Sequence, residues 1–159
     1  MIAAALLCLV VGISDGDSLT VRCGAPGDYQ EHRVRIAAID APERGQTYSQ
    51  RARQTLSALC YRQQATIVQT AVDDYGRVVG DVQCRGQDAG QHMVRTGMAW
   101  AFDRRPYTHR HLYDLQDAAK AARIGLWEAV DTDKPPIPPW RWRPAYQNAQ
   151  QPIAGERAR

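Results

Sequence analysis

Residues 10–23 have the sequence VVGISDGDSLTVRC, two stretches of strand-forming residues joined by a tight turn, and they decide the fold. The DGD at 15–17 is typical of a β-hairpin turn, and 10–14 and 18–23 are expected to form its strands. Apolar and polar residues alternate in the second strand, which indicates one buried face. The sequence therefore predicts a hairpin whose turn carries two acids.

Working outward from this hairpin, the pattern continues. Residues 32–39 are expected to form a third strand, which ends before Pro42 because proline cannot continue a ladder. Apolar residues at helical spacing predict a helix at 49–60. Further strands are expected at 65–69 and 77–84, and further helices at 89–96 and 107–123. Five short strands with a helix between the third and the fourth are typical of an OB-type barrel, a mainly β fold with added helices (α+β).

Length and charge set outer limits on the function. The chain has 159 residues, enough for one domain with a modest core and a tail. The net charge of +3 permits an anionic partner but does not require one. No apolar run approaches the length of a membrane span, so no stable membrane association is expected. The predicted domains are 1–9, a remnant or end of an export signal; 10–128, the barrel domain; and 129–159, an extension rich in Pro, Trp and Arg whose end is expected to be disordered.

The apolar N-terminus and the cysteines bear on the compartment. Residues 1–11 are similar to the core of an export signal but lack a basic start and a clear cleavage site; a buried N-terminal strand is the alternative. Cys8 falls in this segment, which leaves three cysteines in the folded body. With export, one disulfide and one free thiol are expected, and Cys60 with Cys84 is the preferred pair; three reduced thiols are the alternative. The predicted location is secreted or periplasmic.

Three acids and two arginines carry the chemistry. Asp17, Asp40 and Glu43, with Arg35 and Arg77, each fall near the end of an expected strand. Metal-assisted phosphodiester cleavage needs this set, because two acids can hold a divalent cation, a third can act on water, and two guanidiniums can neutralise a phosphate. The hydrolase interpretation requires these side chains to converge around one cation. Acids that point apart, or an arginine in the place of the ion, would contradict it.

Each of these features also has a purely structural explanation. The DGD at 15–17 is a good turn, and Glu43 can favour the first turn of a helix. Arg35 can be solvated on the outer face of its strand, and 75–77 can be a simple hairpin tip. The occurrence of all five polar residues together favours the catalytic interpretation.

Residues 10–127 resemble the staphylococcal nuclease (thermonuclease) family of the bacterial exported type. The resemblance rests on motifs that occur in the family's order: DGDS at 15–18, a run ending in DAPE at 40–43, DDYGR at 73–77, VRTGMA at 94–99, and AARIGLW at 121–127. It implies an OB-fold five-stranded barrel with about three helices. It also implies a calcium-dependent nuclease that hydrolyses DNA and RNA with low sequence specificity and prefers single-stranded or frayed substrate. A monomer is expected.

The resemblance also implies a role for each matched residue. Asp17, Asp40 and the backbone carbonyl of Ala41 would bind Ca²⁺. Glu43 would position or deprotonate the attacking water, and Arg35 and Arg77 would clamp the phosphate. The alternative is a non-catalytic nucleic-acid-binding OB module of the same fold, although such a module would be expected to lose the acids first.

The chain departs from the family pattern at the substrate side. Asp74 stands where the family often has lysine, and an acid there is expected to weaken or redirect nucleotide binding. The family's tyrosine pair is not cleanly present, so Tyr75 and Tyr107 are the candidates for binding substrate, with Trp100 and Phe102 as further aromatic groups that can equally be core. The WRWR run at 140–143 can clamp nucleic acid or cover the barrel, and packing is favoured.

Overall fold

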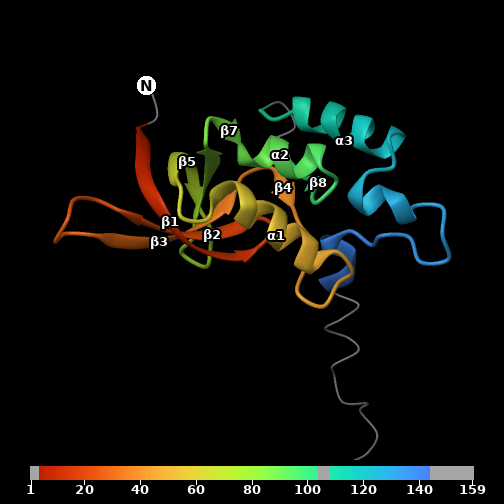
Figure 1. Ribbon diagram of the computed structural model, residues 1–159, viewed down its shortest axis with the longest axis horizontal. Coiled ribbons are helices and arrows are strands. Elements are labelled where there is room, and N and C mark those ends of the chain that lie inside the picture. The colour runs from red at the N-terminus through yellow and green to blue at the C-terminus, as the bar shows by residue number, and fades with distance from the viewer. Residues whose placement is uncertain (1–3, 104–107, 144–159) are drawn as a thin grey trace, which may run out of the picture.

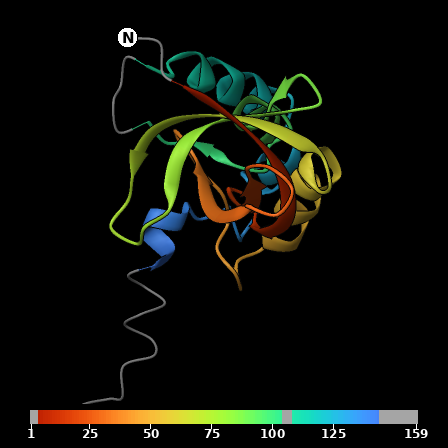
Figure 2. The same ribbon diagram turned by 90° about the vertical axis from the view of Figure 1, so that its left-hand side faces the viewer.

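The structure, a computed structural model, describes residues 4–103 and 108–143 (Figure 1). A six-stranded sheet has the strand order β3-β2-β1-β5-β6-β7, and a parallel pairing of β3 with β6 closes five of these strands into a barrel (Figure 2). The predicted OB-type α+β fold is therefore confirmed. The strands are β1 Ala5–Asp15, β2 Ser18–Cys23, β3 Gln30–Ile36, β4 Ile39–Asp40, β5 Gln64–Val72, β6 Val78–Cys84, β7 Gln87–Asp88 and β8 Trp100–Ala101.

The barrel is filled by the apolar faces of its strands. Leu19 and Val21 on β2 and Val34 and Ile36 on β3 are buried, because alternate residues of a strand point to the same face. The polar residues between them lie outside this core, and Arg35 is one of them. The alternation therefore directs the Arg35 side chain away from the packed interior.

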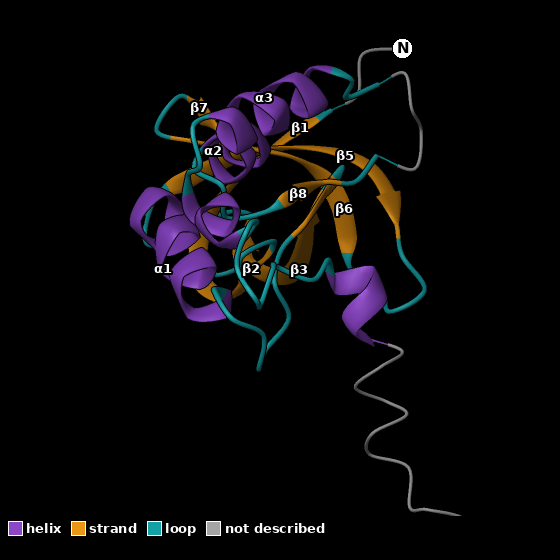
Figure 3. Cartoon of the chain, turned by 90° about the vertical axis from the view of Figure 1, so that its right-hand side faces the viewer, coloured by secondary structure: helices purple, strands orange, loops and turns teal. Residues whose placement is uncertain are grey.

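Helices cover part of the barrel (Figure 3). The helix α1, Ser49–Cys60, has the predicted bounds and buries Ala52, Leu56 and Leu59. Farther along the chain, α2, Ala89–Arg95, packs on α3, His111–Ala121, and the 3₁₀ helix η1, Gly125–Ala129, follows. No helix in the described part of the chain is long and apolar enough to cross a bilayer.

The helix predicted at 107–123 is shorter than expected. Within the described residues it begins at His111, and residue 107 lies outside them. It ends at Ala121, and Ala122 beyond it is exposed. Gln116 on this helix is buried, and its amide oxygen accepts a hydrogen bond of 3.0 Å from the backbone N–H of Ala101.

The strand predicted at 32–39 is divided in two. It ends at Ile36 because Ala38 adopts a φ of 60°, a left-handed conformation that a strand cannot continue. Ile39–Asp40 then forms β4 and pairs with the equally short β8 in a separate two-stranded sheet. This pairing places Asp40 in a fully buried position, which differs from its position at the end of one continuous strand.

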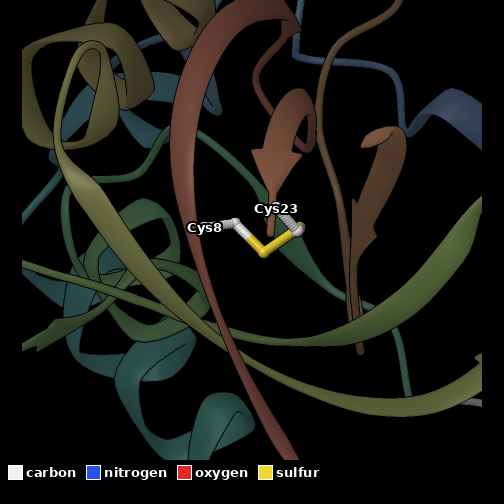
Figure 4. The surroundings of a disulfide bond; sticks show 2 residues. All are labelled: Cys8 and Cys23. Atoms are coloured by element: carbon white, nitrogen blue, oxygen red, sulfur yellow. A yellow bond between two sulfur atoms is a disulfide. The ribbon is translucent and has the colours of Figure 1, made fainter. Parts of the chain in front are cut away.

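Two disulfides connect the described cysteines. Cys60–Cys84 joins the end of α1 to β6, so the preferred pair is confirmed. Cys8–Cys23 joins paired positions of β1 and β2 (Figure 4). The expected free thiol was therefore wrong, because no cysteine is free. Residues 5–9, which were assigned to the end of an export signal, pair with β5 as part of β1; a targeting role for this segment stays a prediction.

The C-terminal extension contacts the barrel. After η1 the chain runs through exposed residues to a short helical turn at 139–143. This turn lies at the same end of the barrel as the β5–β6 turn (Figures 2 and 3). The ring of Trp140 stacks on that of Phe102, with centroids 4.8 Å apart. The packing interpretation of this tryptophan is therefore correct, and the expected disorder near the end of the extension falls outside the described residues.

Candidate active site

One cavity of about 690 Å³ opens at the end of the barrel where the predicted side chains meet. Asp40 does not line it and lies fully buried. Tyr107 lies outside the described residues. The other predicted site side chains all line this cavity: Asp17, Arg35, Glu43, Tyr75 and Arg77.

Asp17 connects the hairpin turn to the segment after β4. Its Oδ2 accepts a hydrogen bond of 2.8 Å from the backbone N–H of Ala41, and its Oδ1 accepts one of 2.9 Å from the hydroxyl of Ser18. The contact with Ala41 spans 24 positions of sequence. It holds the acid of the first hairpin beside the acid at the end of β4, as the hydrolase interpretation requires.

Asp40 is a buried acid with one unsatisfied oxygen. Burial, together with the charge of Asp17, raises the pKa of Asp40 to about 6, while Arg35 acts in the opposite direction. Its Oδ1 accepts from Arg35 Nη2 at 3.3 Å, whereas its Oδ2 is buried without a hydrogen-bond partner among the described residues. Such an atom is costly to bury unless something pairs with it.

Asp17 and Asp40 fit a hard divalent cation, because carboxylate and carbonyl oxygens are the ligands that such ions take. The unpartnered oxygen of Asp40 is the observation that favours this fit. In the described part of the chain, no cluster of three or more Asp, Glu, His or Cys side chains forms a metal site by itself. Two acids with a backbone carbonyl, the predicted ligand set, remain consistent with the geometry.

Asp15 is a further acid of the site, half-buried, which the sequence predicted only as part of a turn. Burial, the charge of Asp17 and the proximity of Glu43 raise the pKa of Asp15 to about 7. Burial also acts to raise the pKa of Asp17, but Arg35 and hydrogen bonds from Asp15, Ala41 and Ser18 lower it below its usual value. Of the two turn acids, Asp15 therefore holds a proton more tightly and Asp17 carries the charge. The sequence signal for Asp15 was its place in the DGD motif beside Asp17.

Arg35 is held rigidly beside the two acids. Its Nη1 donates to the backbone carbonyl of Ile39 at 3.0 Å and lies 3.7 Å from Asp17 Oδ2. With the contact to Asp40 described above, the guanidinium is fixed on several sides, so little of its motion would be lost on binding an anion.

The second arginine of the site, Arg77, is positioned by Asp73. The carboxylate of Asp73 accepts from Arg77 Nε at 2.7 Å and from the backbone N–H groups of Tyr75 and Arg77 at 3.0 Å each. Although slight burial acts in the opposite direction, these hydrogen bonds lower the pKa of Asp73. Arg77 also lies over the Tyr75 ring, 5.5 Å from its centroid. Asp73 was part of a predicted motif but had been given no role.

Comparison with known proteins identifies the family of the chain. A sequence model described as "Staphylococcal nuclease homologue" matches residues 33–129. The chain belongs to the staphylococcal nuclease family. It is 40% identical over 152 residues to a protein named micrococcal nuclease from Shigella flexneri, covering 88% of this chain and 82% of that protein. It is also 40% identical over 137 residues to a protein named uncharacterized endonuclease from Haemophilus influenzae, covering 86% of this chain and 72% of the relative.

The family assignment makes the chain a hydrolytic nuclease. A more distant relative shares only the domain: a probable staphylococcal-like nuclease from Oryza sativa is 34% identical over 125 residues, which is 77% of this chain and 31% of that protein. The family match ends at residue 129. The contacts that the extension makes with the site therefore lie beyond the last residue of this match.

Arg143 is the largest departure from the predicted site. Its Nη2 lies 2.8 Å from Asp40 Oδ1, and its Nε donates to Glu43 Oε1 at 2.6 Å. An arginine therefore does reach the acids, which the sequence analysis had named as an argument against hydrolysis. It contacts one oxygen of Asp40 and leaves the other unpartnered, and the arginine that pairs with Asp17 is Arg35. The signal for it was the WRWR run, which had been interpreted as packing.

His109 forms part of the cavity wall. It precedes α3, and its Nε2 lies 2.8 Å from Asp81 Oδ1. Its backbone N–H donates to Asp103 Oδ2 at 3.0 Å. The nuclease site is thus bordered by a polar wall in which Asp74 also takes part.

Proposed function

We propose that this nuclease hydrolyses phosphodiester bonds of DNA and RNA with Ca²⁺ as its cofactor and with little sequence preference. The observation that carries the proposal is the convergence of Asp17, Arg35, Glu43 and Arg77 on one cavity, with Asp40 buried beside it. These residues come from the β1–β2 turn, the β3–β4 region and the start of β6, so only the folded barrel brings them together.

Asp17, Asp40 and the carbonyl of Ala41 are proposed to hold the ion. The hydrogen bond between Ala41 and Asp17 supports this set because it keeps both residues at one place. When bound, Ca²⁺ would polarise a phosphoryl oxygen. The ligand role of the Ala41 carbonyl stays a prediction, as does the identity of the ion.

The remaining residues would act on the attacking water and on the phosphate. Glu43 lines the cavity, and its carboxylate would orient a water molecule and accept its proton. As the phosphorus becomes five-coordinate, negative charge grows on its oxygens, and Arg35 and Arg77 would stabilise that charge. The contacts that fix both guanidiniums support this role, because a preorganised donor loses little on binding.

Tyr75 is proposed to bind substrate by stacking on a base. Its side chain is largely solvent-exposed, at 75%, and it lies at the cavity beside Arg77. Stacking on an aromatic ring requires an unpaired base, which would give a preference for single-stranded or frayed nucleic acid. Tyr107 remains the second proposed stacking residue. Asp74 lines the same cavity and would disfavour a phosphate close to it.

We further propose that the protein acts as a monomer outside the cytosol. Two disulfides support a secreted or periplasmic location, because such bonds persist in oxidising compartments.

The proposal is tested by incubating the purified protein with single-stranded DNA, duplex DNA and RNA, in Ca²⁺ or in a chelator. We expect degradation in Ca²⁺ only, fastest on the single strands. Asp40→Asn is a matched control, because it keeps the shape of the side chain and removes its charge, and it should be inactive in both conditions. Equal activity with and without Ca²⁺ would remove the metal from the mechanism. A rise in melting temperature with Ca²⁺ but no turnover would instead favour a non-catalytic binding module.

A further inference from the structure

Residues 137–143, here called the C-terminal latch, dock on the active site through several contacts. Trp140 stacks on Phe102, as described above, and meets Trp100 edge-on with centroids 6.2 Å apart. The ring of Trp142 lies over Gly45, 3.7 Å from the position that a Cβ there would take. Gln46 donates from its side chain to the carbonyl of Ile137 at 2.8 Å.

The loop at 41–46 joins the latch to Glu43, the residue proposed to act on water. The backbone N–H of Glu43 donates to Gln46 Oε1 at 2.7 Å, and the other end of the Gln46 amide holds Ile137. The latch therefore contacts the 41–46 loop through its backbone as well as through Arg143. Its position relative to Glu43 is defined by several contacts and not by one flexible side chain.

Arg143 brings a positive charge to two carboxylates of the site. It forms ion pairs with both Asp40 and Glu43, and the Asp40 side chain is fully buried. Charge-assisted hydrogen bonds of this kind are stronger than neutral ones, and a buried carboxylate that loses its partner is strongly destabilised. The guanidinium therefore already compensates part of the negative charge that would attract a divalent cation.

The guanidinium of Arg143 occupies Asp40 Oδ1, while the oxygen that favours a divalent cation is Asp40 Oδ2, so the two positive charges would share one carboxylate. Asp40 Oδ1 is 2.8 Å from Arg143 Nη2, a separation at which no second cation fits between them. An ion held by Asp17 and Asp40 would also lie close to the arginine, and two like charges in a partly buried site repel each other. Binding of the ion should therefore favour release of the arginine, and release should favour binding.

We propose that Arg143 is an internal competitor of the metal ion, so that the C-terminal latch restrains the nuclease until the ion displaces the arginine from Asp40 and Glu43. This inference rests on the proposed Ca²⁺ dependence. The displacement needs only a side-chain movement: the Arg143 side chain is 41% exposed, so it can turn into water while Trp140 stays stacked on Phe102. The latch lowers apparent affinity for Ca²⁺ because only the released form is competent to bind.

The test is the dissociation constant of Ca²⁺, measured by titration calorimetry on the full chain and on two variants. Arg143→Ala should bind Ca²⁺ about tenfold more tightly than the unmodified protein, the change expected when a competent fraction of about one tenth becomes fully populated. Arg141→Ala is the matched control. Arg141 is exposed two positions earlier and forms no ion pair within the described residues, so its loss removes the same charge and should leave the affinity unchanged.

Melting temperature gives a second readout, which does not depend on turnover. Without Ca²⁺, Arg143→Ala should melt below the unmodified protein, because Glu43 loses its ion pair with Arg143 and Asp40 keeps only the one with Arg35. The rise caused by saturating Ca²⁺ should be larger in the variant. If Arg143→Ala does not fold, Arg143→Lys is the second variant: it keeps the charge but not the fork of donors, and it should bind Ca²⁺ more tightly than the unmodified protein.

Other outcomes would overturn the proposed competition between Arg143 and the ion. Equal, measurable affinity in Arg143→Ala and the unmodified protein would show that the arginine does not compete, while the proposed function stands. Weaker Ca²⁺ binding in Arg143→Ala would make Arg143 a residue that supports the site. Absence of binding in both proteins would overturn the latch together with the proposed cofactor.

Discussion

Asp40 shows most clearly, at the level of a single residue, that this barrel is built around a charge. Its side chain is fully buried, it accepts from Arg35 and Arg143, and one of its oxygens still has no partner in the described part of the chain. Burying an acid in this way lowers the stability of the fold unless its oxygens are paired. Asp40 and Asp17 are far apart in the sequence, so a local turn does not explain why they lie together.

Arg77 should contribute to the rate more than to the fold. Its contacts are with Asp73 and Tyr75 at the tip of a hairpin, so Arg77→Ala should retain the barrel. The loss of a guanidinium that stabilises phosphoryl charge should slow hydrolysis by about 10³-fold. The measurement is single-turnover cleavage of a labelled oligonucleotide.

Arg22→Ala provides a control for this arginine. Arg22 lies on β2 away from the cavity, is exposed, forms an ion pair with Glu31 and lies over the Tyr29 ring. Its loss should change the rate little. If Arg77→Ala cleaves at the rate of Arg22→Ala, Arg77 has no part in the reaction.

At the level of elements, the β1–β2 turn depends on a close approach to α1. A Cβ on Gly16 would lie 2.7 Å from the Cβ of Ala52 and 2.8 Å from that of Ala41, closer than real side chains come. Gly16 therefore lets the turn that carries Asp17 fit beneath the helix and beside Ala41. This is a packing requirement, since no left-handed conformation is involved.

Gly16→Ala should destabilise the protein by about 1–3 kcal/mol, the usual cost of overpacking a well-packed site. It should also reduce activity, because the turn would have to move away from Ala41. Gly12→Ala is the control on β1, the strand that leads into this turn, where a Cβ would lie 3.6 Å from the Cβ of Thr20, an ordinary contact. Urea unfolding of both variants tests this, and identical midpoints would contradict it.

The two disulfides should stabilise the fold by similar amounts. Cys60 and Cys84 are 24 positions apart and Cys8 and Cys23 are 15 apart. Restriction of the unfolded chain predicts about 3 kcal/mol for each, with a difference between them below about 0.5 kcal/mol. Replacing either pair by alanines should lower the free energy of unfolding accordingly. An unchanged urea midpoint for one pair would show that its bond does not form in solution.

The elements that the sequence predicted well are those with a clear period or a clear turn. The helix at 49–60 and the strand at 18–23 matched in their bounds, because their apolar spacing is regular and turns flank them. The strands β4 and β8 have two residues each, too few for any period to appear. The true start of β1 was hidden because an apolar N-terminal strand and an export signal have the same composition.

At the scale of the whole molecule, the site consists of segments that are far apart in the chain. The order of the family motifs allowed Asp17, Arg35, Glu43 and Arg77 to be predicted as neighbours, and the cavity confirms that they are. Arg143 could not be predicted in the same way, because it lies outside the motifs and reaches the site only through the docking of a Pro-rich extension. Contacts of this kind depend on tertiary packing and leave no local pattern.

We propose that these distant segments form one hydrolytic centre in which Glu43 acts on water. The most direct test is the single-turnover rate of cleavage by Glu43→Gln in saturating Ca²⁺, with Glu31→Gln on the exposed part of β3 as control. We predict a loss of about 10³-fold for Glu43→Gln, the usual contribution of a general base, and a near-normal rate for the control. A Glu43→Gln rate within threefold of the unmodified protein would contradict the account.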